Sequence, residues 1–185
     1  MRWDALFDDL ESQLQAAVEA GQESEIRDRT RVEQSRLTLV QRLLGSVGLP
    51  VEVSTRAGRF LSGTLAHVGS RWISLTVEGR SVIVPFSSLQ SLRGLGRGVA
   101  PAPAGVRAKL GLGTALRALS RDRAHVSLWL TSPSRYDGVI DRVGADFFEV
   151  ALVVPGEERR AANIRDVLTV PFDAVDSLEA AGPAG

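Results

Sequence analysis

The chain has 185 residues, with 22 acidic and 22 basic side chains and no cysteine. The lack of cysteine excludes disulfides, thiolate metal sites and thiol nucleophiles. No apolar run reaches the roughly 18 residues that a transmembrane helix needs, and the acidic N-terminus is unlike a signal peptide. We therefore expect a soluble, cytoplasmic protein without membrane insertion.

Charge is distributed unevenly along the chain. Residues 1–44 hold 9 acids and 6 bases, residues 45–123 hold 3 and 11, and residues 124–185 hold 10 and 5. The basic middle predicts either an anionic partner or contact with the acidic segments. Every basic residue except Lys109 is an arginine, a bias that resembles proteins of GC-rich bacteria.

The first 44 residues are predicted to form a helical arm. Between Trp3 and Ala20 the apolar residues fall at helical spacing, and a second helical stretch covers residues 23–44 and ends before a glycine. Such an arm either covers a neighbouring domain or mediates self-association. Trp3 and Phe7 are its candidate interface residues.

Five short strands are predicted next, and then a linker rich in Gly, Pro and Ala, a short helix and a second set of strands. Alternating apolar residues give the strands one buried face, as in residues 71–77. The predicted boundaries are 1–44 for the helical arm, 45–94 for the first strand domain, 95–111 for the linker, 112–179 for the short helix and second strand domain, and 180–185 for a disordered tail.

The two sets of strands repeat one sequence pattern. Gly63-x5-Gly69 corresponds to Gly138-x5-Gly144, 75 residues later, and VPFSSLQSL at 84–92 corresponds to VPFDAVDSL at 170–178, 86 residues later. The second copy therefore carries 11 extra residues, in the polar stretch around 155–166. Because two copies are too few for a solenoid, we predict two small domains in tandem that pack together.

A helix followed by five short bent strands, with a glycine inside strand two and a Val-Gly turn into strand three, resembles the Sm-like fold. This family of small SH3-like open barrels includes bacterial and archaeal RNA-binding proteins. The resemblance covers residues 36–94 and 112–179, and Gly63 and Gly138 match the first family motif, where a mid-strand glycine predicts a bulge or bend. It implies an α+β fold of two tandem five-stranded Sm-like or SH3-like open β-barrels preceded by N-terminal helices.

The departures from the family pattern bear on function. Family members that bind uridine-rich RNA carry an Asp-x-x-x-Asn signature at the turn into strand three and Arg-Gly after strand four. Here residues 70–74 are SRWIS, residues 145–149 are ADFFE, and Val-Pro-Phe stands at the second place in both copies. With both RNA-contact motifs absent, the resemblance implies protein assembly at least as strongly as RNA binding.

Arginines near the predicted strand ends of the first copy, and after it, are the candidate nucleic-acid or anion-binding residues. Guanidinium groups bind phosphate bidentately, and clustered positive charge speeds association. Alternatively, these arginines form a solvated rim or pair with acids of the second copy and the helical arm, which the neutral net charge favours. The candidates are Arg56, Arg59, Arg71, Arg80, Arg93 and Arg97.

Trp72 and Phe147 occupy equivalent positions and are candidate interface residues. Their rings either stack on nucleic-acid bases or, as is more common for such residues, pack under a helix or in an interface. His67 and His125 lack metal-ligand spacing, and no serine has the context of a catalytic triad. We therefore predict no enzyme activity, no metal or other cofactor and no small-molecule substrate.

The expected function is a scaffold or adaptor that binds a protein partner or self-associates. RNA or DNA binding by the arginine-rich first domain and linker is the alternative. The two hypotheses differ in what they require of the basic middle of the chain. Nucleic-acid binding requires its arginines to be exposed.

Overall fold

The computed structural model divides the chain into two units, Met1–Thr38 and Leu39–Gly185. The described residues between 13 and 35 are helical, whereas the predicted interface residues Trp3 and Phe7 and the tail 181–185 lie outside the described part. No helix in the described part is long and apolar enough to cross a membrane. The structure describes residues 34–101, 104–105, 109–152 and 166–180, together with Gln13, Gln15, Ala16, Val18, Arg29, Arg31 and Val32.

Each copy of the sequence pattern contributes a short helix and five strands to the second unit. In the first repeat these are α2 (Leu39–Leu44), β1 (Pro50–Thr55), β2 (Phe60–Val68), β3 (Trp72–Val77), β4 (Arg80–Pro85) and β5 (Leu89–Arg93). In the second repeat they are α3 (Leu112–Arg121), β6 (His125–Leu130), β7 (Arg135–Val143), β8 (Phe147–Leu152), β9 (Asp166–Pro171) and β10 (Val175–Ala180). Short 3-10 turns, η1 (Phe86–Ser88) and η4 (Phe172–Ala174), precede β5 and β10.

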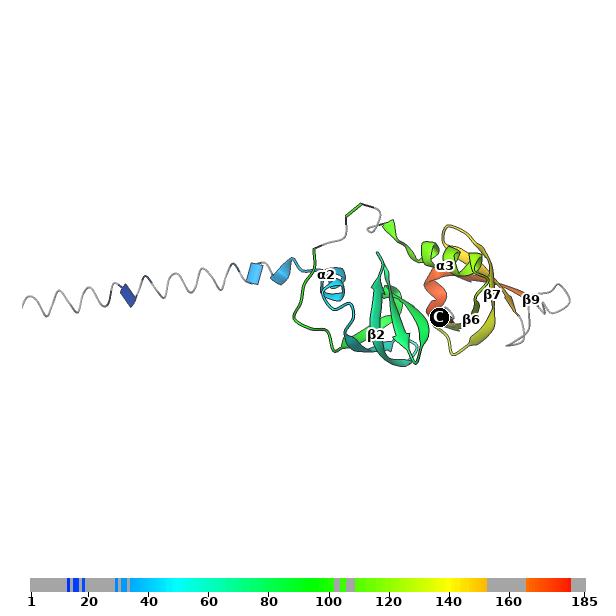
Figure 1. Ribbon diagram of the computed structural model, residues 1–185, viewed down its shortest axis with the longest axis horizontal. Coiled ribbons are helices and arrows are strands. Elements are labelled where there is room, and N and C mark those ends of the chain that lie inside the picture. Colours follow the sequence, from blue (N-terminus) through cyan, green and yellow to red (C-terminus); the bar gives the residue numbers. More distant parts are fainter. Residues whose placement is uncertain are drawn as a thin grey trace, which may run out of the picture. The chain divides into compact units, whose positions relative to one another are not determined.

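The ten strands form one antiparallel sheet in the order β5-β1-β2-β3-β4-β10-β6-β7-β8-β9. Helix α2 lies beside the strands of the first repeat and α3 beside those of the second (Figure 1). The expectation of two tandem barrels in an α+β fold is thus confirmed only in part. The protein is mostly β with two short helices, and the sheet is not closed into a barrel. The physical reason is that β4 pairs with β10 of the other repeat, so the two sets of strands share one hydrogen-bonded ladder.

The strand register is the same in both repeats. Leu65 pairs with Leu75 in the first, and the residues 75 positions later, Ile140 and Val150, pair in the second. A bulge follows at the same place, between Leu65 and His67 and between Ile140 and Arg142. The extra residues of the second copy fall between β8 and β9, mostly outside the described part. The sequence offset therefore predicts the strand pairing within each repeat.

Each repeat has its own hydrophobic core between its strands and its short helix. Leu43 of α2 packs in one core with Leu65 and Leu75, and Leu116 of α3 packs in the other. All of these side chains are almost fully buried, which stabilises each repeat by about 2 kcal/mol per large side chain. The alternating pattern read from the sequence thus gives two cores in one sheet.

At the mid-strand glycines Gly63 and Gly138, two neighbouring strands approach each other closely. A Cβ atom on Gly63 would lie 2.4 Å from the carbonyl oxygen of Thr76, and one on Gly138 would lie 2.3 Å from that of Ala151. The bulges expected at these glycines lie instead two to four residues further along β2 and β7. Glycine is required here because any side chain would collide with the backbone of the neighbouring strand.

We expect Gly63→Ala and Gly138→Ala each to lower the free energy of unfolding by about 2 kcal/mol, because the added methyl group forces two paired strands apart. Gly111→Ala is the matched control, since its Cβ would meet no atom within 4 Å. This substitution should lower the free energy of unfolding by less than about 1 kcal/mol. Chemical denaturation of the three variants measures these free energies. Equal losses at all three positions would contradict the close-approach argument.

Candidate functional site

The junction of the two repeats is a continuous β-ladder with buried polar groups on it. Leu178 pairs with Ile83 and Ala180 pairs with Ser81. Next to this ladder, the fully buried Ser88 hydroxyl donates a hydrogen bond of 2.7 Å to the carbonyl oxygen of Val175. A buried hydroxyl without an acceptor would be costly, so this contact fixes η1 against the start of β10.

A buried carboxylate lies at the centre of the junction. Asp176 is fully buried, and it accepts hydrogen bonds from the hydroxyl of Thr55 at 3.0 Å and the backbone N–H of Ala57 at 3.4 Å. The hydroxyl of Ser177 donates a third, at 3.2 Å. Because a buried charge needs such partners, Asp176 of the second repeat holds the β1–β2 turn of the first.

Two of the predicted arginines act across the same junction. Arg59 lies 4.1 Å over the ring of Trp129, donates to the hydroxyl of Ser177, and lies 3.9 Å from the Glu179 carboxylate. Burial lowers the pKa of Arg59, which the charge of Glu179 opposes. Arg80 donates to Glu179 at 2.8 Å, and this hydrogen bond raises the pKa of Arg80. Arg59 therefore joins the repeats through a cation–π contact and a hydrogen bond, and Arg80 adds a charge-assisted hydrogen bond that is exposed to solvent and contributes less.

The other four predicted arginines are exposed, as Arg80 also is despite its contact with Glu179. Arg56 follows β1, Arg71 precedes β3, and Arg97 lies in the segment after β5. Arg93 on β5 is 83 % exposed and lies 3.9 Å from Glu52. The structure thus brings Arg59 and Arg80 together at Glu179 and places the remaining candidates on separate elements, so the six do not act as one group.

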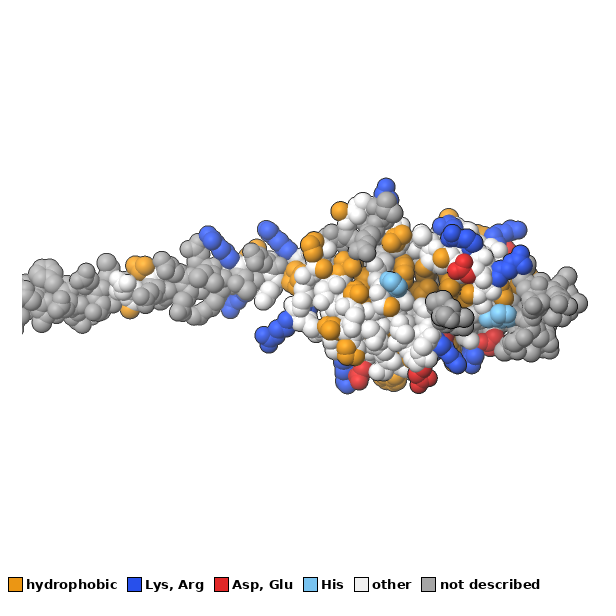
Figure 2. Space-filling view, in the orientation of Figure 1, with side chains coloured by type: hydrophobic (Ala, Val, Ile, Leu, Met, Phe, Trp, Pro, Cys, Tyr) orange, Lys and Arg blue, Asp and Glu red, His pale blue; other side chains and the backbone are white. Residues whose placement is uncertain are grey.

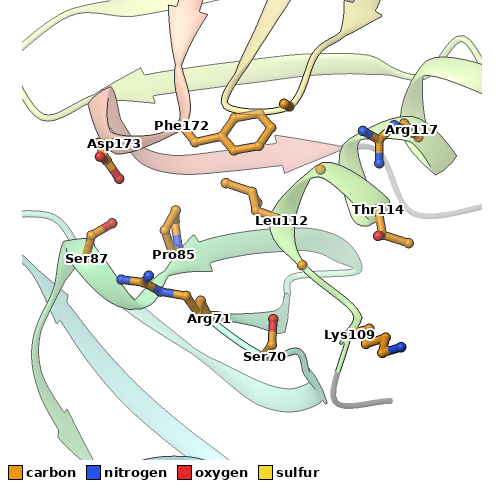
Figure 3. A pocket seen from close by; sticks show the side chains of 13 residues that line it. Ser70, Arg71, Pro85, Ser87, Lys109, Leu112, Thr114, Arg117, Phe172 and Asp173 are labelled. Carbon is orange, nitrogen blue, oxygen red and sulfur yellow. The ribbon is translucent and has the colours of Figure 1, made fainter. Parts of the chain in front are cut away.

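A cleft of about 360 Å³ opens where the linker joins the repeats (Figure 3). Pro85, Leu112 and Phe172 form its apolar centre, with basic side chains around them. The walls of the cleft come from the turn before β3, from η1 and from the start of α3. The lining residues are Ser70, Arg71, Pro85, Ser87, Lys109, Gly111, Leu112, Gly113, Thr114, Arg117, Ala145, Phe172 and Asp173.

The charge of this cleft is positive on balance. Its lining holds three basic residues, Arg71, Lys109 and Arg117, and one acid, Asp173. Helix α3 begins here, and its N-cap residue Gly111 offers no side-chain cap. The positive end of the helix dipole therefore adds to the positive potential of the cleft. Chemically, the arrangement suits a small anionic group such as a phosphate.

The cleft is held in place by hydrogen bonds from both repeats. The carbonyl oxygen of Leu110 accepts from the backbone N–H of Ser70 at 3.1 Å and from the indole N–H of Trp72 at 2.8 Å. On the other side, Arg117 donates to the carbonyl oxygen of Gly144 at 3.1 Å. These contacts fix the end of the linker, and with it the start of α3, between the two repeats.

A second hollow, the apolar groove, has a volume of about 490 Å³ and lies between α2, strands β2 and β3, and the linker. All of its lining residues except His67 are apolar. Figure 2 shows apolar side chains reaching the visible surface of this part of the chain. The lining residues are Leu44, Val47, Ala66, His67, Val68, Trp72, Ala100, Pro101 and Leu110.

The equivalent aromatics Trp72 and Phe147 each pack on a glycine of their own repeat. A Cβ on Gly69 would lie 2.1 Å from the indole nitrogen of Trp72, and one on Gly144 would lie 2.4 Å from the ring of Phe147. Both rings are half-buried, and neither lies on the strands that join the repeats. Trp72 also lines the apolar groove, which leaves its role in an interface a prediction.

Sequence reasoning missed the residues of the second repeat that form the junction. Trp129 and Asp176 correspond to Ser54 and Gln90 in the first repeat, so the pattern shared by the copies gives no sign of them. The available signal was the difference itself, an aromatic and an acid where the other copy has small or neutral polar residues.

Comparisons with known proteins add no assignment. The sequence matches no protein-family model, and a search of curated proteins finds no significant match. Among the residues that the structure describes, no group of three or more His, Asp or Glu side chains is placed to hold a metal ion.

We expect Asp176→Ala to lower the free energy of unfolding by about 3 kcal/mol, because Thr55 and Ala57 lose their acceptor and Arg59 loses a nearby negative charge. Gln90→Ala, at the equivalent and exposed position of β5, is the matched control and should change it by less than about 0.5 kcal/mol. Thermal and urea denaturation compare the two; similar effects would show that the junction does not depend on Asp176.

Proposed function

We propose that this protein is a non-enzymatic cytoplasmic scaffold or adaptor that binds a protein partner through tandem Sm-like repeats and a helical arm. The observation that carries the proposal is the apolar groove, whose walls come from α2, two strands and the linker. An exposed, concave apolar surface is typical of sites that bind another protein chain.

The surroundings of the apolar groove support this function. Val47 within it is 46 % exposed, and Val99, next to the lining residue Ala100, is 45 % exposed. Water-exposed apolar side chains beside a groove gain free energy when an apolar segment covers them, by about 25 cal/mol per Å² of apolar surface. A partner segment with one or two large apolar side chains fits this surface.

The Sm-like assignment is part of the proposal. What supports it is the composition of each repeat, in which a short helix precedes five antiparallel strands that keep one register. The sites that carry RNA-contact motifs in that family hold other residues here, which favours protein assembly over RNA binding.

A photo-crosslinking residue at Val47 should capture a specific protein partner in the native cytoplasm, whereas one at Phe60, which is 86 % exposed outside the groove, should not. Val47→Asp should then weaken binding of the captured partner by about tenfold or more, because it places a charge in an apolar contact. The melting temperature of the variant checks that the fold is retained. Capture of protein equally from both positions, or from neither, would contradict the proposal.

Nucleic-acid binding is the second candidate, and the positive cleft favours it. Arg71, Lys109 and Arg117 surround one hollow, and such a cluster can neutralise phosphate groups. Arg59 and Arg80 do not contribute to this site because their side chains are engaged across the junction.

If nucleic acid binds at the cleft, combined substitution of Arg71→Ala and Lys109→Ala should reduce the slope of log affinity against log salt by about 1 for each phosphate group that is no longer neutralised. Arg142→Ala is the control, since Arg142 is exposed on β7, outside the cleft, and pairs with Glu149. Filter binding to single-stranded RNA and DNA over a range of salt concentrations measures the slope. Failure of the chain to retain either at low salt would remove this candidate.

A further inference from the structure

The apolar groove and the positive cleft have a wall in common, which consists of residues 70–72 and 109–111. Arg71 and Lys109 line the cleft. The residues that follow them in sequence, Trp72 and Leu110, line the groove. The carbonyl oxygen of Leu110 accepts hydrogen bonds from the indole N–H of Trp72 at 2.8 Å and from the backbone N–H of Ser70 at 3.1 Å. These bonds hold the two stretches of this shared wall together, so the two hollows keep fixed positions relative to each other.

We propose that the groove and the cleft form one binding site for an acidic segment of a partner protein. The segment places a large apolar side chain in the groove and a carboxylate group in the cleft. The two groups are only a few residues apart, because consecutive residues of the shared wall line the two hollows. This inference rests on the proposed function, since it requires a protein segment in the groove, and it adds the chemistry that recognises this segment.

The groove provides the apolar half of the site. Its volume is about 490 Å³, and His67 is the only polar residue of its lining. Val47 remains 46 % exposed there, so an apolar side chain from a partner removes apolar surface of both chains from water. Aromatic side chains and leucine suit this half, because they bury the most apolar area in a single contact.

The cleft provides the charged half of the site. Arg71 and Lys109 are exposed, and neither forms an ion pair within the described part of the chain. Arg117 is engaged with the carbonyl oxygen of Gly144 at 3.1 Å, and Asp173 is the one acid of the lining. Arg71 and Lys109 are therefore the cations that take up an incoming carboxylate, which a guanidinium group binds through two parallel hydrogen bonds.

The segments that form the groove and the shared wall contain bases and no acid. This holds for residues 39–49, 60–77 and 94–111, which include α2, β2, β3 and the linker. An acidic partner segment is therefore attracted to this surface, and a basic one is repelled. The basic residues of these segments are Arg42, Arg71, Arg97, Arg107 and Lys109.

The positive charge beside the groove is not required by the fold. Asp146 occupies in the second repeat the place of Arg71, directly before Phe147, which corresponds to Trp72. In both repeats the N–H of the preceding glycine donates to the carbonyl oxygen of the aromatic residue at 2.8 Å. Because this turn accepts either sign of charge, Arg71 distinguishes the surface of the first repeat and not its fold.

The groove favours a protein segment over nucleic acid. Base stacking needs an exposed aromatic face, but Trp72 is half-buried, its indole N–H bonds Leu110, and its ring packs against Gly69. Apart from Trp72 and His67 the lining is aliphatic, so it offers no hydrogen bonds to the edges of bases. An apolar side chain therefore fits the groove better than a nucleotide does.

Selection of peptides from a random phage-displayed library on the immobilised full chain tests the proposal. Peptides that bind the wild type should carry a large apolar residue with aspartate or glutamate a few residues away. Selection on the chain with Arg71→Gln and Lys109→Gln should still enrich the apolar residue but no longer the acids, because only charges of the cleft are removed. Arg142→Gln is the matched control, since Arg142 is an exposed arginine outside both hollows, and it should select the same peptides as the wild type.

A synthetic peptide from the wild-type selection then measures the two halves of the site separately. Arg71→Gln with Lys109→Gln should raise its dissociation constant about tenfold, and added salt should narrow this difference because it screens the charges. Val47→Asp should raise the dissociation constant at least as much, through the apolar half. Circular dichroism of all variants checks their fold.

Enrichment of apolar residues without acids would overturn this inference and leave the proposed function in place. So would a selected peptide whose affinity is unchanged by the two glutamine substitutions. If no selected peptide depended on Val47, both the inference and the proposed function would fall. Retention of single-stranded RNA or DNA by a chain that selects no peptide would assign the cleft to nucleic acid instead.

Discussion

The pairing of β4 with β10 is the interaction on which the rest of the second unit depends. Backbone hydrogen bonds make the two repeats one sheet, and the buried Asp176 carboxylate and the Arg59 guanidinium join the side chains across it. Asp176 and Arg59 both find partners for their charges there, whereas the indole N–H of Trp129 beside them is buried without a hydrogen-bond partner. The linker is then fixed at Leu110 by donors of the first repeat, and the cleft and the groove take their shapes on either side of it.

The two repeats have diverged mostly at their surfaces and edges. Register, bulges and glycine contacts are the same in both copies, because a change at Gly63 or Gly69 would force backbone or ring atoms apart. The charge at the start of β4 and of β9 is under no such constraint and differs in sign, with Arg80 at the central junction and Asp166 on the outer strand. Two copies of one structural unit can therefore carry a closed junction in the middle of the sheet and open edges at its ends.

The described part of this unit contains two hollows of different chemistry, the apolar groove of the first repeat and the positive cleft at the end of the linker. They differ in chemistry, so each selects a different chemical group. The lining of the groove suits apolar side chains, and that of the cleft suits an anionic group.

The sequence by itself determined the repeat, the strands and the core of each copy. Local patterns contain this information. The alternation of apolar and polar residues sets which face of a strand is buried, and residues 75 positions apart pair in the same register in the two repeats. Only the tertiary structure decided that the strands form one open sheet, and that Arg59 and Arg80 meet Glu179 across the junction of the repeats. Which carboxylate an arginine meets depends on contacts between residues more than 90 positions apart, such as Arg80 and Glu179, and no local pattern records these contacts.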